Sequence, residues 1–255
     1  MDIKILVATH KTYWMPDDDV YLPLHVGREG KPDLGYLGDN SGDNISSKNP
    51  NFCELTGLYW AWKNLQCDYV GLCHYRRYFC AGSYGSDVYS KRKSIFQRPD
   101  YEKLLKQYDI ILPKKRNYYI ETVRSQYEHA HNKSDLDEVK RIIDEKYPEY
   151  GEAFNKVMNR ISLHIYNMFA MKKDLFDEYC QWLFVILFEL EKRIDISFYD
   201  VYQARVYGFL SERLFNVWLE NQDLKIKECE VVCLESVDWF HKITSFINRK
   251  FNRGV

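Results

Sequence analysis

Short apolar runs recur along the chain and are separated by polar segments. The first run, Ile3 to Ala8, predicts a buried strand that leads directly into a polar segment. Comparable runs predict further strands at Tyr69 to Cys73, Tyr108 to Leu112, His164 to Met171 and Glu230 to Leu234, and an edge strand at Asp17 to Pro23.

Between these runs, apolar residues at every third or fourth position predict helices. The expected helices are one that opens at Asn49-Pro50 and continues to Leu65, two surface helices within 135–159 broken at Pro148, one capped by Asp174 and one from about Val201 to Glu220. The alternation of strands and helices predicts an α/β fold in which helices flank a mainly parallel sheet. We find no repeat or linker, so we expect one domain over residues 1–241.

Residues 242–255 differ in character from the rest of the chain. Four basic residues and no acid accompany apolar residues at helical spacing: Lys242, Arg249, Lys250 and Arg253 with Ile243, Phe246, Ile247 and Phe251. This pattern predicts a small basic amphipathic helix. It would contact the inner face of a membrane or, as the simpler alternative, pack on the domain with its basic side in solvent.

Composition narrows the class of partner. Lys and Arg number 36 against 37 acidic residues, so there is no overall attraction to nucleic acid, and a basic site must be local. Aromatic residues make up 16% of the chain, as on surfaces that stack on flat or sugar-like ligands. Seven scattered cysteines, and a start that resembles neither a signal peptide nor a membrane span, favour a cytoplasmic protein with reduced thiols.

The strongest chemical signal lies at the end of the Tyr69 to Cys73 strand. His74, Tyr75, Arg76 and Arg77 follow it directly. Ligands of α/β sheets bind outside the carboxyl ends of strands, where guanidinium groups can pair with phosphates and aromatic rings form apolar walls. A nucleotide or sugar diphosphate would suit this arrangement. The alternative is that the rings are part of the core and the arginines form a solvated rim.

Two further polar segments belong to the candidate site. Thr9, His10 and Lys11 follow the first strand, without the glycine patterns of dinucleotide-binding or P-loop proteins. A turn-rich loop carries Asp39, Asn40 and Asn44, and its glycines would let the backbone approach a ligand closely. For these residues the alternative is an ordinary turn or capping role.

Many blocks of the sequence, in order, resemble one family. They are Val7 to Lys11, Pro23 to Gly27, Leu34 to Asp39, Gly42 to Ser46, Lys48 to Thr56, Tyr59 to Lys63, His74 to Phe79, Leu112 to Lys114, Tyr166 to Phe169 and Tyr199 to Arg205. The family comprises bacterial glycosyltransferases of capsule, exopolysaccharide and O-antigen gene clusters, long catalogued as a domain of unknown function and marked by a His-Tyr-Arg-Arg-Tyr motif. Some members are galactofuranosyltransferases that use UDP-galactofuranose.

The resemblance implies a GT-A-like, Rossmann-like domain and assigns roles by position. Thr9, His10 and Lys11 would hold the nucleoside, and His74, Tyr75, Arg76 and Arg77 would face the diphosphate. Asp39, Asn40 and Asn44 could bind hydroxyl groups of the ribose or the donor sugar. The donor and acceptor sugars would meet a further group of residues, namely Asn167, Met168, Gln203 and Arg205; a buried structural amide is the alternative for Asn167.

No metal is expected with the UDP-sugar. GT-A enzymes carry an Asp-x-Asp motif at the strand end where this chain has His74-Tyr75-Arg76, and fixed cationic side chains can offset the charge of a leaving diphosphate as a metal does. The expected partners are a UDP-sugar and a glycan or lipid-linked acceptor, not nucleic acid.

An inverting transfer needs a carboxylate that accepts the proton of the acceptor hydroxyl. Asp200 is our first candidate, because it precedes the Tyr202 to Arg205 segment, and Glu121 is the second. An aspartate before a helix is also an ordinary N-cap. A carbohydrate-binding or nucleotide-sugar-binding protein without catalysis is the alternative function, although it would give no reason for paired arginines at a strand end.

Overall fold

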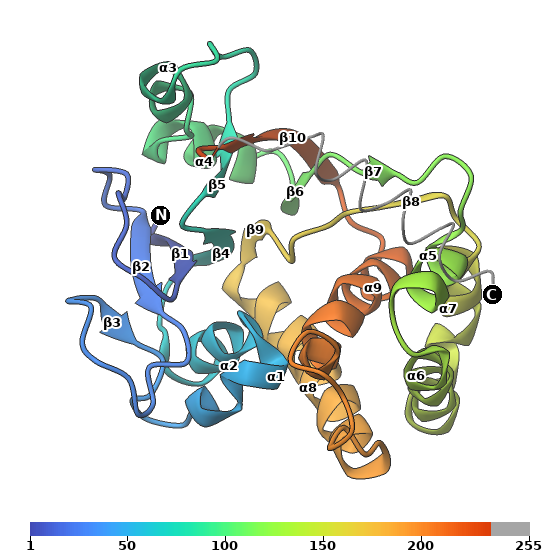
Figure 1. Cartoon of the computed structure of the whole chain (residues 1–255). Helices are drawn as coiled ribbons and strands as arrows, with labels where there is room; N and C mark the ends of the chain where they lie inside the picture. The colour runs from blue at the N-terminus through green and yellow to red at the C-terminus, as the bar shows by residue number, and fades with distance from the viewer. Residues whose placement is uncertain (236–255) are drawn as a thin grey trace.

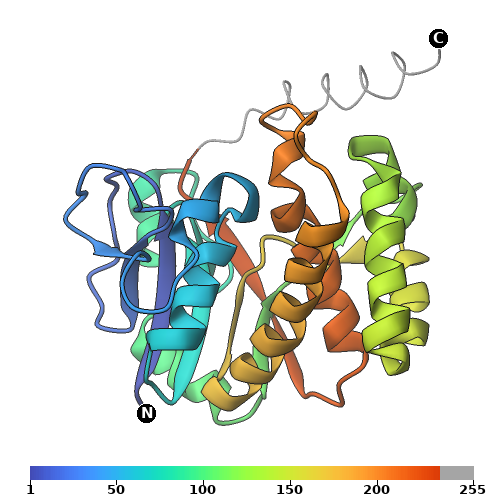
Figure 2. The same ribbon diagram turned by 90° about the horizontal axis from the view of Figure 1, so that it is seen from below.

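The computed structural model describes residues 1–235, which form an α/β fold with helices on both faces of a central sheet (Figures 1 and 2). The predicted tail at 242–255 and the end of the predicted domain lie outside the described residues. The strands are β1 (Ile3–Thr9), β2 (Tyr21–His25), β3 (Leu37–Gly38), β4 (Tyr69–His74), β5 (Arg77–Cys80), β6 (Ile110–Pro113), β7 (Arg116–Asn117), β8 (Ser162–Leu163), β9 (Phe169–Lys172) and β10 (Ile226–Cys233).

The α-helices of the described residues are α1 (Asn49–Phe52), α2 (Leu55–Asn64), α3 (Val88–Lys93), α4 (Arg98–Leu105), α5 (Val123–Ala130), α6 (Lys133–Lys146), α7 (Gly151–Met158), α8 (Lys173–Arg193) and α9 (Val206–Glu220). Short 3₁₀ turns lie at Ser46–Lys48, Pro148–Tyr150 and Gln203–Arg205.

The central sheet has the strand order β3-β2-β1-β4-β5-β10-β6-β9, with β4 also paired to β9. Strands β3, β2, β1 and β4 run parallel, in agreement with the mainly parallel sheet that the sequence predicts. Beyond β4 the sheet is mixed: β6 and β10 are parallel, whereas β5 and β9 are antiparallel to their neighbours. The expectation of a mainly parallel sheet therefore holds only for the β3-to-β4 half.

Both faces of the sheet are buried, which explains the continuous apolar runs of its central strands. On β1, Leu6 and Ala8 face a core shared with α2, α8 and α9, while Ile5 and Val7 face a second core that includes α4. Figure 1 shows these helices on opposite sides of the strands. This two-sided packing fixes the ends of the parallel strands along one edge.

Two predicted elements are interrupted by residues with left-handed backbone. The helix expected over Asn49 to Leu65 breaks at Cys53, with φ of 54°, into α1 and α2. The strand expected over His164 to Met171 begins only at Phe169, because Tyr166 and Asn167 have φ of 76° and 53°. Non-glycine residues adopt this conformation at a cost that surrounding contacts must offset.

Other differences concern element ends. The segment expected as an edge strand at Asp17 to Pro23 is a turn followed by β2, and β3 covers the outer side of β2. Asp174 lies in the first turn of α8 and does not cap it. Sequence patterns also missed β5, because its residues belong to the charged motif after β4 and form a hairpin in which His74 pairs with Arg77.

Candidate functional site

The carboxyl ends of the four parallel strands lie side by side. Thr9 of β1 is in register with His25 of β2, His25 with Gly38 of β3, and Ala8 of β1 with His74 of β4. The segments that follow these strands therefore meet at one edge of the sheet, where α/β proteins bind their ligands.

Tyr75 and Arg76 form the turn of the hairpin between β4 and β5. Arg76 is 39% exposed, and its guanidinium lies 2.8 Å from a carboxylate oxygen of Glu235, which follows β10. The other oxygen of Glu235 lies 3.5 Å from Lys11 Nζ. One carboxylate thus bridges two of the residues predicted to hold the donor.

The buried ring of Tyr75 forms the floor beneath these charges. The rings of His10 and Tyr13 meet it edge-on, with centroids 5.4 and 5.0 Å away. Lys11 Nζ and the Arg76 guanidinium lie 4.9 and 5.6 Å from its centroid. Tyr75 is buried among these side chains, and its predicted contact with the donor stays a prediction.

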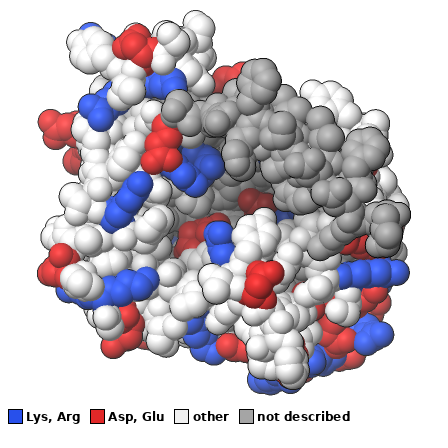
Figure 3. Space-filling model, in the orientation of Figure 1, with Lys and Arg blue, Asp and Glu red and all other residues white. Residues whose placement is uncertain are grey.

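A local positive field surrounds His10. Desolvation lowers the pKa of its imidazole, and the charges of Lys11, Lys31, Arg76 and Arg205 lower it further. These cations come from four separate segments of a chain whose net charge is -1. Such a cluster favours an anionic ligand, and guanidinium groups in particular suit phosphate. In Figure 3 this face is hollowed near its centre, and both basic and acidic side chains lie in the hollow.

His74 does not add to the positive field. Its Nε2 lies 2.7 Å from the backbone oxygen of Tyr166, so Nε2 carries a proton and donates it. Burial lowers the pKa of His74, and the Glu54 charge only partly opposes this effect, so the imidazole is neutral near pH 7. The predicted role of His74 at the diphosphate stays a prediction, and in this structure its Nε2 is engaged with the Tyr166 carbonyl. Arg77 lies with its guanidinium 4.6 Å from the centroid of the Tyr166 ring.

Two carboxylates hold the left-handed pair Tyr166 and Asn167. Glu212 accepts a hydrogen bond from the Tyr166 backbone N–H at 2.7 Å. Glu54 accepts one from Asn167 Nδ2 at 2.8 Å, and the same amide nitrogen lies 2.9 Å from Ser211 Oγ. Burial raises the pKa of Glu212, and the nearby Glu54 charge raises it further. The Asn167 side chain therefore links Glu54, at the start of α2, to Ser211 of α9, and its predicted contact with a sugar stays a prediction.

Met168 is fully buried in the core that β1 shares with α4. The prediction that Met168 meets a sugar stays a prediction, and the buried position gives it no support. Thr9 is also fully buried, and its hydroxyl donates to the backbone oxygen of Lys11 at 2.6 Å. The Thr9 side chain thus shapes the turn that carries His10 and Lys11, and its predicted contact with a nucleoside stays a prediction.

The turn-rich loop uses its polar side chains internally. Asp39 is fully buried and accepts hydrogen bonds from the backbone N–H groups of Gly27 and Arg28 and from Ser46 Oγ. Asn44 bonds Gly42 and Ser46 within its own turn. Both residues have the turn role that the sequence left as the alternative, and their predicted contacts with the donor stay predictions.

Asn40 is exposed, and its side-chain amide lies 3.4 Å from Glu29 Oε2. Its predicted contact with a sugar or ribose hydroxyl stays a prediction.

Both carboxylates predicted as the catalytic base have hydrogen-bond partners in the structure. Oδ1 of Asp200 accepts hydrogen bonds from the backbone N–H groups of Tyr202 and Gln203, both at 2.8 Å, in a capping arrangement. Glu121 Oε1 lies 2.6 Å from His129 Nδ1. The catalytic role of either residue stays a prediction.

Gln203 and Arg205 have different surroundings. Gln203 donates to the backbone oxygen of Ala130 at 2.9 Å and so connects the start of α9 to the end of α5. Arg205 lies beside the strand ends, where its Nε is 3.1 Å from Cys53 Sγ and its charge acts on His10. Only Arg205 of this pair joins the cationic cluster.

Sequence patterns missed three acidic residues of this edge: Glu54, Glu212 and Glu235. Glu54 lies in what reads as a continuous helix, Glu212 is a half-buried residue within α9, and Glu235 lies just after a strand. The only sequence signal was the inclusion of Glu54 in a block shared with the resembled family.

Within residues 1–235, no three His, Cys, Asp or Glu side chains are grouped so that they could hold a metal ion. In the same range, no helix has the length and apolar character needed to cross a membrane.

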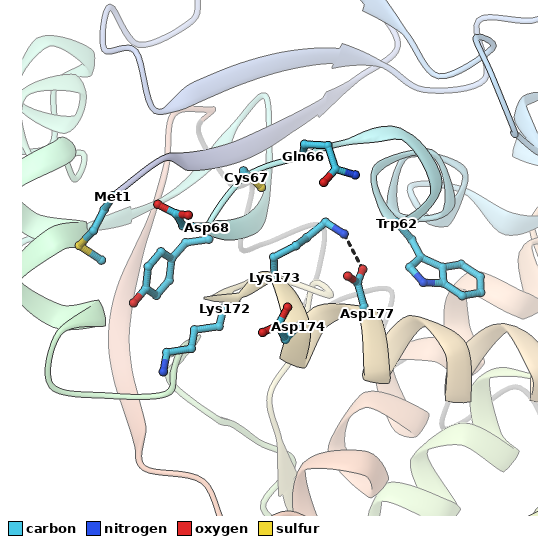
Figure 4. A pocket seen from close by; sticks show the side chains of 10 residues that line it. Met1, Trp62, Gln66, Cys67, Asp68, Lys172, Lys173, Asp174 and Asp177 are labelled. Atoms are coloured by element: carbon cyan, nitrogen blue, oxygen red, sulfur yellow. Dashed lines mark hydrogen bonds and ion pairs between the residues drawn. The ribbon is translucent and has the colours of Figure 1, made fainter.

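A cavity of about 740 Å³ opens at the opposite edge of the sheet, beside the start of β4 and α8 (Figure 4). It is lined by Asp68, Lys172 and Asp174 among others, and Lys173 pairs there with Asp177 at 2.6 Å. The cavity contains none of the predicted site residues.

Comparison with known proteins places the chain among its relatives. The model of the family described as "Domain of unknown function (DUF4422)" matches residues 4–223. A solved structure entitled "WbbM bifunctional glycosytransferase apo structure" is similar over 92% of this chain, with a TM-score of 0.86 and 32% sequence identity. The matched part is 46% of the WbbM chain, so this chain spans about half the length of that relative.

No curated protein matches the sequence. Since the family model covers most of the chain, the protein belongs to the DUF4422 family.

Proposed function

We propose that this chain is a glycosyltransferase that moves a sugar from a UDP-sugar to a glycan or lipid-linked acceptor in the synthesis of bacterial surface polysaccharide. The observation that carries the proposal is the pair of cations Lys11 and Arg76 beside the Tyr75 ring, at the carboxyl ends of parallel strands, with the charge of Arg205 also acting on the neighbouring His10. That arrangement suits the diphosphate and flat base of a nucleotide.

The similarity to WbbM supports the same class of reaction. A chain that matches about half of a bifunctional glycosyltransferase would carry one of two transfer activities. The resemblance to galactofuranosyltransferases favours UDP-galactofuranose as the donor. A GT-A-like domain is compatible with the parallel order of β3, β2, β1 and β4.

In the proposed reaction, the oxygen of an acceptor hydroxyl attacks the anomeric carbon opposite the diphosphate. The bond from that carbon to the phosphate oxygen breaks, UDP leaves with the electron pair, and a carboxylate takes the hydroxyl proton. Arg76 and Lys11 would stabilise the charge that develops on the diphosphate. We therefore propose an inverting transfer that needs no metal ion.

The test is to incubate the protein with a panel of UDP-sugars and measure UDP release and binding, with and without EDTA. We expect slow hydrolysis of one donor, UDP-galactofuranose, that persists in EDTA. Loss of activity in EDTA and its restoration by Mn²⁺ would refute metal independence. Tight binding of a UDP-sugar without turnover, with any acceptor offered, would favour a nucleotide-sugar-binding protein.

A further inference from the structure

We infer that Glu54 is the general base of the transfer, an inference that rests on the proposed glycosyltransferase function. The residue lies at the break between α1 and α2, where the left-handed Cys53 turns the chain. Helix α2 begins at this break, and contacts with Asn167 and Arg205 place the break at the edge of the sheet that carries the candidate site.

The position of Glu54 is central among the site residues. Its Oε1 accepts a hydrogen bond from Asn167 Nδ2, next to the Tyr166 carbonyl that binds His74. Its charge also acts on His74 and Arg205, which come from β4 and from the turn before α9. Glu54 therefore lies beside Asn167 and close enough to His74 and Arg205 for its charge to act on both.

The packing around Glu54 fixes its place. Gly208 of α9 leaves so little room that a Cβ there would lie 3.1 Å from Cys53 Sγ. Asn51 also donates to the backbone oxygen of Ala204 at 2.8 Å, on the other side of the same junction. These contacts fix the backbone on the N-terminal side of Glu54, and the hydrogen bond from Asn167 orients its carboxylate, as proton transfer requires.

The other carboxylates at this edge of the sheet form ion pairs or more hydrogen bonds than Glu54 does. Glu235 bridges Arg76 and Lys11, and Glu212 binds the Tyr166 N–H and lies 3.3 Å from Arg213 Nη1. Asp200 accepts two backbone hydrogen bonds. Glu54 accepts one amide hydrogen bond and forms no ion pair within residues 1–235. Glu54 is half-buried, so an acceptor hydroxyl can reach its carboxylate. The amide that donates to this carboxylate is neutral.

In this role Glu54 takes the proton of the acceptor hydroxyl. At the same time the hydroxyl oxygen bonds to the anomeric carbon, and UDP leaves with the electron pair of the broken bond. The protonated carboxyl then returns the proton to water. Only the ionised carboxylate can accept the proton, so the rate must fall as acid protonates it.

The experiment compares Glu54→Gln with the wild type. The glutamine oxygen can still accept from Asn167, so we expect an unchanged melting temperature and unchanged UDP affinity, with turnover at least about a hundredfold lower. The acid limb of the pH profile should disappear in this variant. Glu54→Asp should recover part of the turnover. Glu230→Gln, whose carboxylate is paired with Lys114 away from the site, is the matched control and should retain wild-type turnover.

The remaining outcomes separate the two proposals. If Glu54→Gln keeps most of its turnover, or keeps the acid limb, the role of Glu54 is wrong while the glycosyltransferase proposal stands. If Asp200→Asn or Glu121→Gln instead loses turnover at unchanged UDP affinity, the base is that residue. If the wild type neither binds UDP nor turns over any donor, the proposed function itself fails.

Discussion

At the scale of single residues, Arg76 is the cation best placed to meet a phosphate. Its guanidinium is partly exposed, lies near the Tyr75 ring and contributes to the field at His10. Arg76→Ala should remove about 2–4 kcal/mol of transition-state stabilisation, seen as a lower kcat/KM for the UDP-sugar. Arg141→Ala, on the exposed side of α6, should leave kcat/KM unchanged. An Arg76 variant with wild-type kinetics would exclude this residue from the diphosphate site.

Glu235 competes for the same cation. Its carboxylate bridges Arg76 and Lys11, and these two contacts lower its pKa. A diphosphate would have to displace it, so Glu235→Gln should bind UDP several times more tightly, as measured by calorimetry. Glu230→Gln should bind like the wild type. Weaker binding in the Glu235 variant would mean that the carboxylate positions the two cations and does not compete with the ligand.

At the scale of elements, the central strand β4 depends on a glycine. A Cβ at Gly71 would lie 2.7 Å from the Phe169 backbone oxygen of β9 and 2.6 Å from Ile5 Cδ1 of β1. Gly71→Ala should therefore lower the free energy of unfolding by about 1–3 kcal/mol, measured by urea denaturation. Gly151→Ala, at the start of α7, meets only Asp144 Oδ1 at 3.3 Å and should cost little. Equal stability of both variants would contradict the close packing of β9 on β4.

At the scale of the whole molecule, the basic amphipathic tail over 242–255 stays a prediction from sequence, because it lies outside the described residues. If it anchors the domain near a lipid-linked acceptor, the full chain should sediment with anionic vesicles at low salt and dissociate as salt rises. A chain truncated after His241 should remain in the supernatant. Equal sedimentation of both chains, or none by either, would leave the tail without a membrane role.

Much of the fold could be predicted because its signals are local. The apolar run of β1 and the apolar periodicity of α8 indicate which of their side chains are buried, because buried positions in a strand or helix recur with the period of that element. The same locality explains the turn role of Asn44, whose partners lie two residues away. The motif after β4 could also be read from the sequence, because arginines and aromatic rings that directly follow a buried strand are typical of a ligand-binding edge.

The composition of the site was decided only by tertiary structure. Glu54 meets Asn167 across 113 positions of the chain, and Arg76 meets Glu235 across 159. No periodic pattern records such pairs, since they depend on where packing brings separate elements together. The charge of His74 was likewise undetermined, because burial and the Tyr166 carbonyl set its protonation. The sequence by itself determined the main strands and helices, though not their breaks or β5, and it showed the cationic motif. The packing of α1, α9 and β10 around that motif decided which carboxylates lie beside it.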